Sequence, residues 1–143
     1  MPKNPIRELP HASAGNIILN PAGWPQPKGY ANGIKARGEM VFTGGMVGWD
    51  ENRKFSDSFA AQTRQVLKNI AAVLAAGGAK PDHIVRMTVY VTDKRLYLAA
   101  TRAIGAAWRE IMGTTYPPMT LVEVKGLLED RALVEIEATV RLP

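Results

Sequence analysis

Two long segments of the chain place apolar residues every three or four positions, which is the period of an amphipathic α-helix. The first segment, 56–76, begins at Ser56 or Asp57 as a capping residue and ends before a Gly-Gly pair. Its predicted apolar face consists of Phe59, Thr63, Val66, Ile70 and Val73. The second segment, 93–112, begins at a capping aspartate. Its narrower face consists of Leu96, Ala100, Ala103, Ala107 and Ile111. These patterns predict two helices.

Other segments alternate apolar and polar residues with the period of two that is typical of a β-strand. They are 39–45, 84–92, 116–124 and 133–142. One predicted face of the second segment holds Val85, Met87, Val89 and Val91. At the last segment, one predicted face holds Ala132, Val134, Ile136, Ala138 and Val140. Its other face holds Leu133, Glu135, Glu137 and Thr139. The segment 47–55 is predicted to be a loop.

The predicted order of elements is β-β-α-β-α-β-β, which indicates an α+β fold with a mixed sheet. Each strand has only one consistently apolar face, so both helices are expected on the same side of the sheet. The second face would then expose Tyr90, Leu121 and Leu133. Because these side chains are too apolar to leave in water over so wide an area, we expect a partner subunit to cover that face.

The length of 143 residues fits one domain, 1–143, and the proline-rich segment 1–16 is expected to be an extended N-terminal arm. No apolar run approaches the roughly 20 residues of a membrane span. The first residues also lack the apolar core of a signal peptide, so a cytoplasmic location is expected. The chain contains no cysteine, which excludes disulfides, a thiol nucleophile and thiolate metal sites.

The net charge of +5 does not by itself predict nucleic-acid binding. The 18 basic residues are scattered, and adjacent basic pairs occur only at Arg53-Lys54 and Lys94-Arg95. No basic stripe interleaved with aromatic residues is present. Scattered positive charge keeps a surface soluble or favours small anions. A nucleic-acid partner is therefore not predicted.

The residues also argue against several kinds of catalytic site. His11 and His83 do not have the spacing of metal ligands with a carboxylate cluster, so no metal site is expected. The glycine-rich segment 77–81 closes a predicted helix, whereas a phosphate-binding loop opens one. The serines have no paired histidine signature. No cofactor is predicted.

Five segments carry a family resemblance: PKGYANGI (27–34), VFTGGMVGWD (41–50), VRMTVYVTD (85–93), YPPMTLVEV (116–124) and LVEIEATV (133–140). In this order and spacing they resemble the RidA (YjgF-like) family of reactive intermediate deaminases. The resemblance extends from about residue 17 to residue 142. It implies a chorismate-mutase-like α+β fold assembled as a homotrimer, with small-molecule clefts between adjacent subunits.

In deaminating members of this family the substrate is an imine or enamine, and a glutamate on the last strand guides the attacking water. The resemblance implies that this catalytic residue is Glu135 here, with Glu137 beside it as a ligand-binding candidate. A general acid or base must lie within hydrogen-bond reach of its water. The alternative is that both are interface carboxylates paired with basic residues such as Arg86.

Met119 is the main departure from the family pattern. It stands where deaminating members carry an arginine that binds the substrate carboxylate. Arginine provides a fixed charge and two parallel donors, whereas methionine provides polarizable apolar contact. Arg131 and Arg102 are candidates for a compensating cation, and the alternative is that each is an ordinary surface arginine. The usual amino-acid imine is therefore in question as a substrate.

The resemblance also implies further ligand-binding positions. They are Tyr30, Gly44, Gly45, Met46, Trp49 and Thr101, together with Met119, Glu137 and Arg131. The alternatives are that Tyr30 fixes the N-terminal arm and that the glycine pair only ends a strand. Ala31 replaces a family serine, and Trp24 is expected to pack.

Two functions remain open at this point. The first is a cofactor-free hydrolytic deaminase of an imine, enamine or related small nitrogen compound, in which Glu135 guides a water. The second is a catalytically silent member that binds a small metabolite or acts as a chaperone-like partner. Glu135 favours the first function, and Met119 favours the second or an unusual substrate.

Overall fold

The computed structural model describes residues 16–143, and residues 1–15, which contain nearly all of the predicted N-terminal arm, lie outside the described residues. The strands of this part of the chain are β1 (Ile17–Leu19), β2 (Gly33–Lys35), β3 (Met40–Phe42), β4 (Met46–Val47), β5 (Ile84–Val91), β6 (Met119–Glu123) and β7 (Val134–Arg141). Its helices are α1 (Phe59–Ala76), the 3₁₀ turn η1 (Pro81–His83), α2 (Lys94–Ala99) and α3 (Thr101–Ile111).

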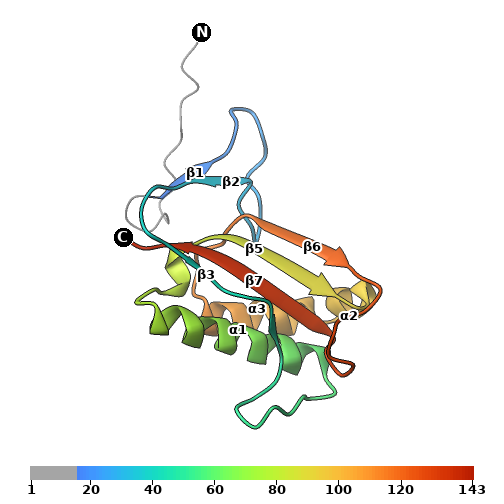
Figure 1. Ribbon diagram of the computed structural model, residues 1–143. Helices are drawn as coiled ribbons and strands as arrows, with labels where there is room; N and C mark the ends of the chain where they lie inside the picture. The colour runs from blue at the N-terminus through green and yellow to red at the C-terminus, as the bar shows by residue number, and fades with distance from the viewer. Residues whose placement is uncertain (1–15) are drawn as a thin grey trace.

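The main sheet has five strands in the order β3-β7-β5-β6, with β4 also paired to β7. β5 and β6 run parallel, whereas β7 is antiparallel to β3, β4 and β5. The α-helices lie together on one face of this sheet (Figure 1). β1 and β2 form a separate antiparallel ribbon. The predicted α+β fold, with a mixed sheet and helices on one face, is confirmed.

The first predicted helix is confirmed as α1, with small differences at its start and on its face. Its N-cap is Ser58, whose Oγ accepts from the backbone N of Ala61 at 3.2 Å, so both predicted caps were wrong by one or two residues. Val73 is 39% exposed. Leu74 is buried instead of Val73, because Leu74 lies four residues after the buried Ile70, about one helical turn of 3.6 residues.

The second predicted helix is in fact two helices. Ala100 leaves the helical conformation at φ −106° and ψ 7°, and it separates α2 from α3. The apolar spacing therefore does not run through both halves. Of the predicted stripe, Ala107 is buried, whereas Leu96 and Ala103 are exposed. Trp108, beside Ala107, is also buried.

The strands follow the predicted alternation except at two positions. The face of β7 predicted to be apolar is buried throughout. In β5 the register shifts between Ile84 and Arg86, so Ile84 is buried and Val85, predicted on that face, is not. Leu121 was predicted on the uncovered side of the sheet, but it packs against the core on the helix side. The predicted loop 47–55 begins one residue early, since Val47 belongs to β4.

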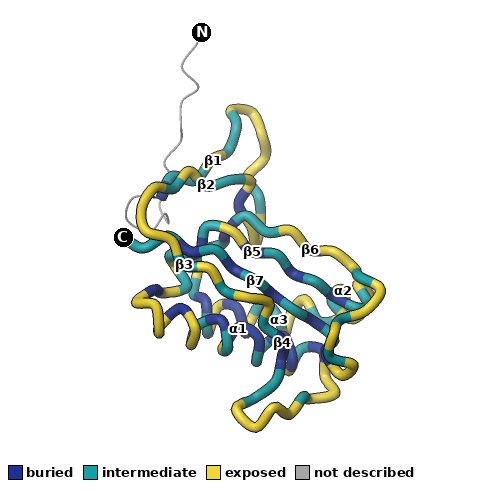
Figure 2. Tube along the Cα trace, in the orientation of Figure 1, coloured by how far each residue is buried: buried dark blue, intermediate teal, exposed yellow. Residues whose placement is uncertain are grey.

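The core fills the layer between the helices and the sheet, and buried positions alternate with partly exposed ones along β5 and β7 (Figure 2). α1 contributes Val66, Leu67, Ile70 and Leu74 to this layer. The opposite face of the sheet, which carries Tyr90, Glu135 and Glu137, is called the uncovered face below. No helix within residues 16–143 is long and apolar enough to cross a membrane.

Candidate functional site

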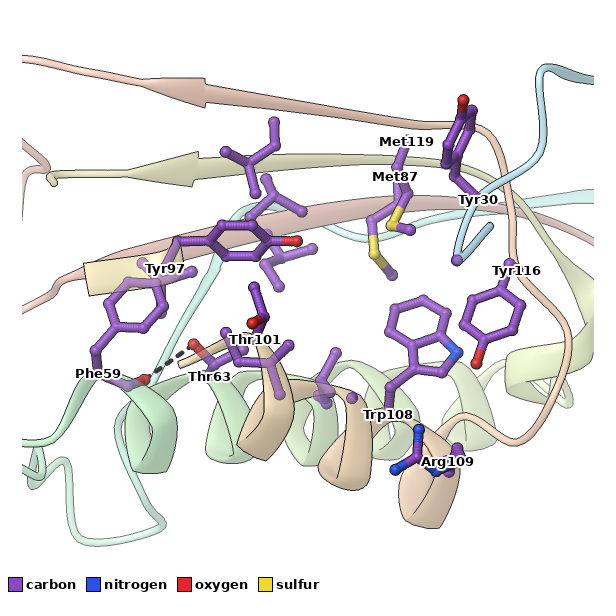
Figure 3. Close-up of a pocket in the computed structure, with 18 of the residues that line it drawn as sticks. Tyr30, Phe59, Thr63, Met87, Tyr97, Thr101, Trp108, Arg109, Tyr116 and Met119 are labelled. Atoms are coloured by element: carbon purple, nitrogen blue, oxygen red, sulfur yellow. Dashed lines mark hydrogen bonds between the residues drawn. The ribbon is translucent and has the colours of Figure 1, made fainter. Parts of the chain in front are cut away.

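A cavity of about 540 Å³ lies between the sheet and helices α1, α2 and α3 (Figure 3). We call it the helix-side cavity. Met87 and Met119 point into it from neighbouring strands, and Trp108 faces them from α3 (Figure 3). The volume is within the range of small-molecule sites. Because its lining is mostly apolar, the cavity suits a ligand with an apolar body.

Trp108 is the most unusual residue of this lining. Its side chain is 7% exposed, and its indole ring stacks on Tyr116 with centroids 5.6 Å apart and planes 12° from parallel. Among the described residues, the buried Nε1 has no hydrogen-bond partner. A buried donor without an acceptor costs free energy, and such groups are rare in folded proteins. The indole therefore offers a free donor to a molecule in the cavity.

Three of the predicted site residues line the helix-side cavity: Tyr30, Thr101 and Met119. The backbone N of Ala31 donates to the carbonyl of Pro117 at 3.1 Å, which holds the Tyr30 loop beside the chain that enters β6. Thr101 is the first residue of α3. Met119 is the first residue of β6 and pairs with Met87 of β5. The fold thus brings together residues from three separate segments.

Glu135 lies on the other side of the sheet. Its neighbours in β7, Val134 and Ile136, line the helix-side cavity, so the alternation of the strand directs Glu135 to the uncovered face. There its carboxylate lies against Gly45, which has no side chain to occupy that space. The structure therefore brings Glu135 and Gly45 together, but it separates both from Met119.

Glu137 occupies the same uncovered face. Its Oε1 accepts a hydrogen bond from the Tyr90 hydroxyl at 3.0 Å. This bond, and the negative charge it brings, raises the pKa of Tyr90 above its ordinary value. Glu137 and Arg86 line a shallow hollow of about 310 Å³, yet no ion pair within residues 16–143 joins Arg86 to Glu135 or Glu137. The predicted alternative of a pairing with Arg86 is not seen in the single chain.

The remaining predicted positions lie away from the helix-side cavity. Gly44 is exposed in the turn between β3 and β4. Met46 pairs with Ile136 in the sheet and packs against the core. Trp49 packs on Phe55, with ring centroids 6.1 Å apart, in the loop after β4. Their assignment to a ligand site stays a prediction.

The two candidate cations have other surroundings. Arg131 forms an ion pair with Asp57 at 2.6 Å and donates to the carbonyl of Phe55 at 3.2 Å, so it holds the loop before α1. Arg102 is exposed on α3 and does not line the cavity. Neither side chain stands in for an arginine at Met119 within one chain. Trp24, which was expected to pack, is 59% exposed.

Sequence reasoning missed Trp108, Tyr116 and Tyr97 as lining residues. A signal was available for the first of these. The lining residues of α3 are Thr101, Ile104, Gly105, Trp108 and Arg109, at helical steps of three and four. The apolar face predicted from the sequence consisted mainly of alanines and lies beside this one. Because alanine is tolerated on any face of a helix, those alanines gave little indication of which face is buried.

The described residues include no group of three or more histidine, aspartate or glutamate side chains that could hold a metal ion. His83 has a local role, since its Nδ1 accepts from the backbone N of Lys80 at 3.1 Å at the start of η1. His11 lies outside the described residues.

A family model described as endoribonuclease L-PSP matches residues 25–142. Over 110 residues the chain is 34% identical to a 2-iminobutanoate/2-iminopropanoate deaminase of Salmonella typhimurium, with 76% of this chain and 84% of that protein covered. The chain belongs to the RidA (YjgF-like) family. The family prediction made from the sequence motifs is therefore confirmed.

Solved structures of RidA-family proteins have the same fold. The Rid-family protein YyfB of Yersinia pestis superposes with a TM-score of 0.78 at 28% identity, covering 90% of this chain and 99% of that one. The TdcF protein of Escherichia coli with bound serine gives a TM-score of 0.67 at 29% identity, covering 85% and 92%. The predicted RidA-type α+β fold is thus confirmed.

Proposed function

We propose that this RidA-family protein is a cofactor-free hydrolytic deaminase of a small imine, enamine or related nitrogen compound. The observation that carries the proposal is the division of the site residues between two sides of the sheet. Glu135 and Gly45 meet on the uncovered face, whereas Tyr30, Thr101 and Met119 meet at the helix-side cavity. One chain cannot bring these two groups to one ligand. Two chains of a homotrimer can, if the uncovered face of one meets the cavity of the next.

In the proposed reaction Glu135 acts as general base towards a water. The water oxygen forms a bond to the imine carbon while Glu135 takes one proton from the water and passes it to the nitrogen, which gives a carbinolamine. Glu135 then transfers the proton of the carbinolamine hydroxyl to the same nitrogen. The carbon–nitrogen bond breaks, ammonia leaves, and the carbon keeps the oxygen as a carbonyl. The balance needs one water and no redox partner.

The names of two relatives support this reaction class. The Salmonella relative is named for deamination of 2-iminobutanoate and 2-iminopropanoate, and the Escherichia coli TdcF structure contains serine. All three molecules are small, and each is an amino acid or derives from one. The retained Glu135 supports the same chemistry here. Met119, in an apolar cavity, favours a substrate that does not rely on an arginine at that position for its anchor.

A second candidate function follows from Met119 itself. Without a cation at this position a carboxylate-bearing imine would lose a charge-assisted contact, which typically contributes several kcal/mol when desolvated. The protein would then bind a small metabolite, or a protein partner, without turning it over. Glu135 would in that case be an interface carboxylate.

The test is ammonia release from freshly generated 2-iminopropionate and from a panel of neutral imines. We expect Glu135→Gln to lower kcat/KM by about 100-fold or more, because the amide cannot accept the water proton. Glu51→Gln, in the exposed loop after β4, is the matched control and keeps the wild-type rate. Ammonia release by Met119→Arg but not by wild type would mean that the Glu135-guided attack of water is intact and that the natural ligand differs from these substrates. Equal rates in wild type and Glu135→Gln would contradict the proposal.

A further inference from the structure

The helix-side cavity contains one buried donor that the protein leaves without an acceptor. Trp108 Nε1 has no partner within residues 16–143, although its side chain is more than nine-tenths buried. Tyr116 covers one face of the indole by stacking. A ligand that supplies an acceptor here gains a hydrogen bond and removes the cost of an unpaired group.

The side chains around this donor favour an aromatic ligand body. Met87 and Met119 converge on the indole from the sheet (Figure 3). Leu121 belongs to the same lining. Thioether sulfur makes favourable contacts with aromatic rings and adapts to their shape. The cavity volume of about 540 Å³ accommodates a one-ring molecule.

The lining offers no buried charge to an ion inside the cavity. None of the lining residues is acidic, and the charged ones are Lys28 and Arg109, both of which are exposed to solvent. Met119, which also lines the cavity, carries no charge. A carboxylate brought to Trp108 would lose its water without gaining a buried counter-ion, which is unfavourable. A neutral acceptor such as a carbonyl or imine nitrogen avoids this cost.

We infer that the helix-side cavity binds a small neutral one-ring aromatic compound, with its ring against Met87 and Met119 and its acceptor on Trp108 Nε1. The inference rests on the proposed function, because it assigns the ligand class to one half of that site. It reverses the selectivity that an arginine at position 119 would give. The substrate would be an aromatic imine or enamine instead of an amino-acid imine.

The test uses three probes of similar size on the full-length protein: acetophenone, benzoate and benzylammonium. The readout is the indole N–H signal of each tryptophan in ¹H–¹⁵N spectra, with the Trp108 signal assigned by its loss in Trp108→Phe. We expect acetophenone to shift the Trp108 signal downfield as the hydrogen bond forms. Benzoate and benzylammonium should bind at least about tenfold more weakly, because each must lose its hydration without a buried counter-ion.

Two variants separate the hydrogen bond from general apolar binding. Because Trp108→Phe lacks the reporter signal, the affinities of the variants are measured by titration calorimetry. Trp108→Phe should weaken acetophenone binding roughly fivefold, the effect of one neutral hydrogen bond, while exposed Trp24→Phe should leave it unchanged. Met119→Arg should reverse the preference, so that benzoate binds more tightly than acetophenone. No shift of the Trp108 signal with acetophenone, or a wild-type preference for benzoate, would overturn the inference.

Glu135→Gln distinguishes a failure of this inference from a failure of the proposed function. The substitution lies on the uncovered face, away from the helix-side cavity of its own chain. If Glu135→Gln abolishes ammonia release and acetophenone does not bind to wild type, the ligand class is wrong and the deaminase stands. If acetophenone binds to both proteins and neither releases ammonia, the ligand class stands and the hydrolytic proposal is wrong.

Discussion

Because Gly45 has no side chain, the carboxylate of Glu135 can occupy the space beside it. A Cβ built on Gly45 would fall far inside contact distance of Glu135 Oε1, with the carboxyl carbon at 2.9 Å. We therefore expect Gly45→Ala to displace this carboxylate and to lower Glu135-dependent ammonia release by about tenfold or more. Folding should change little, because the displaced atoms end a flexible side chain. The measurement is kcat/KM together with the midpoint of thermal unfolding.

Gly44→Ala is the neighbouring comparison for this prediction. A Cβ on Gly44 would meet only Met46 Cε, at 3.9 Å, which is an ordinary contact. Its effect on kcat/KM should be clearly smaller than that of Gly45→Ala. Equal losses in the two variants would mean that the turn between β3 and β4, and not the position of Glu135, sets the rate.

Strand alternation correctly predicted the face of the last strand on which Glu135 lies. Met119, singled out by its position in a recognised segment, lines the helix-side cavity. The roles assigned to both residues stay predictions. The unpaired Nε1 of Trp108 could not be predicted in this way. Whether a buried donor finds an acceptor depends on which side chains surround it, and that depends on how α3 is rotated against the sheet.

At the scale of elements, Gly48 determines how closely α1 approaches the strand β4. A Cβ on this residue would lie 2.7 Å from the carbonyl oxygen of Gln62 and 2.9 Å from its Cα. Because helix backbone cannot move aside as a side chain can, Gly48→Ala should lower the free energy of unfolding by about 3 kcal/mol. Denaturant unfolding at a fixed protein concentration measures this loss.

Gly126→Ala is the control for the helix approach. This glycine, between β6 and β7, has open space where a Cβ would be added. The substitution should change the free energy of unfolding by no more than about 0.5 kcal/mol. A loss for Gly48→Ala no larger than this would show that α1 can move away from β4 at little cost.

Elements were predicted from periodicity, and the errors occur where local geometry breaks the period. Ala100 has the best intrinsic helix propensity, so nothing in the residue type marks the break between α2 and α3. The register shift beside Val85 likewise has no local sequence signal. Such breaks depend on how the element packs against the rest of the fold. The neighbouring residues in the sequence do not contain that information.

At the scale of the molecule, the uncovered face of the sheet carries apolar side chains that the helices do not reach. Phe42 is 70% exposed and shares a shallow hollow with Arg86 and Glu137. Met40, next on the same side of β3, is also exposed. Glu135 also lies on this face. The proposed site is complete only when a second chain brings its helix-side cavity to this glutamate, so the proposed activity requires the assembled protein.

We expect the protein to sediment as a homotrimer and Phe42→Asp to dissociate it, because the substitution would bury a carboxylate without a partner in the proposed interface. Leu98→Asp is the matched control. Leu98 is 63% exposed on α2, in the helix layer, so its substitution should leave the trimer intact. Analytical ultracentrifugation gives the mass, and ammonia release measured on the same samples should fall with the trimer fraction. A monomeric Phe42→Asp protein with full activity would place the whole site within one chain, whereas dissociation by both variants would mean that the helices also contact a neighbouring subunit.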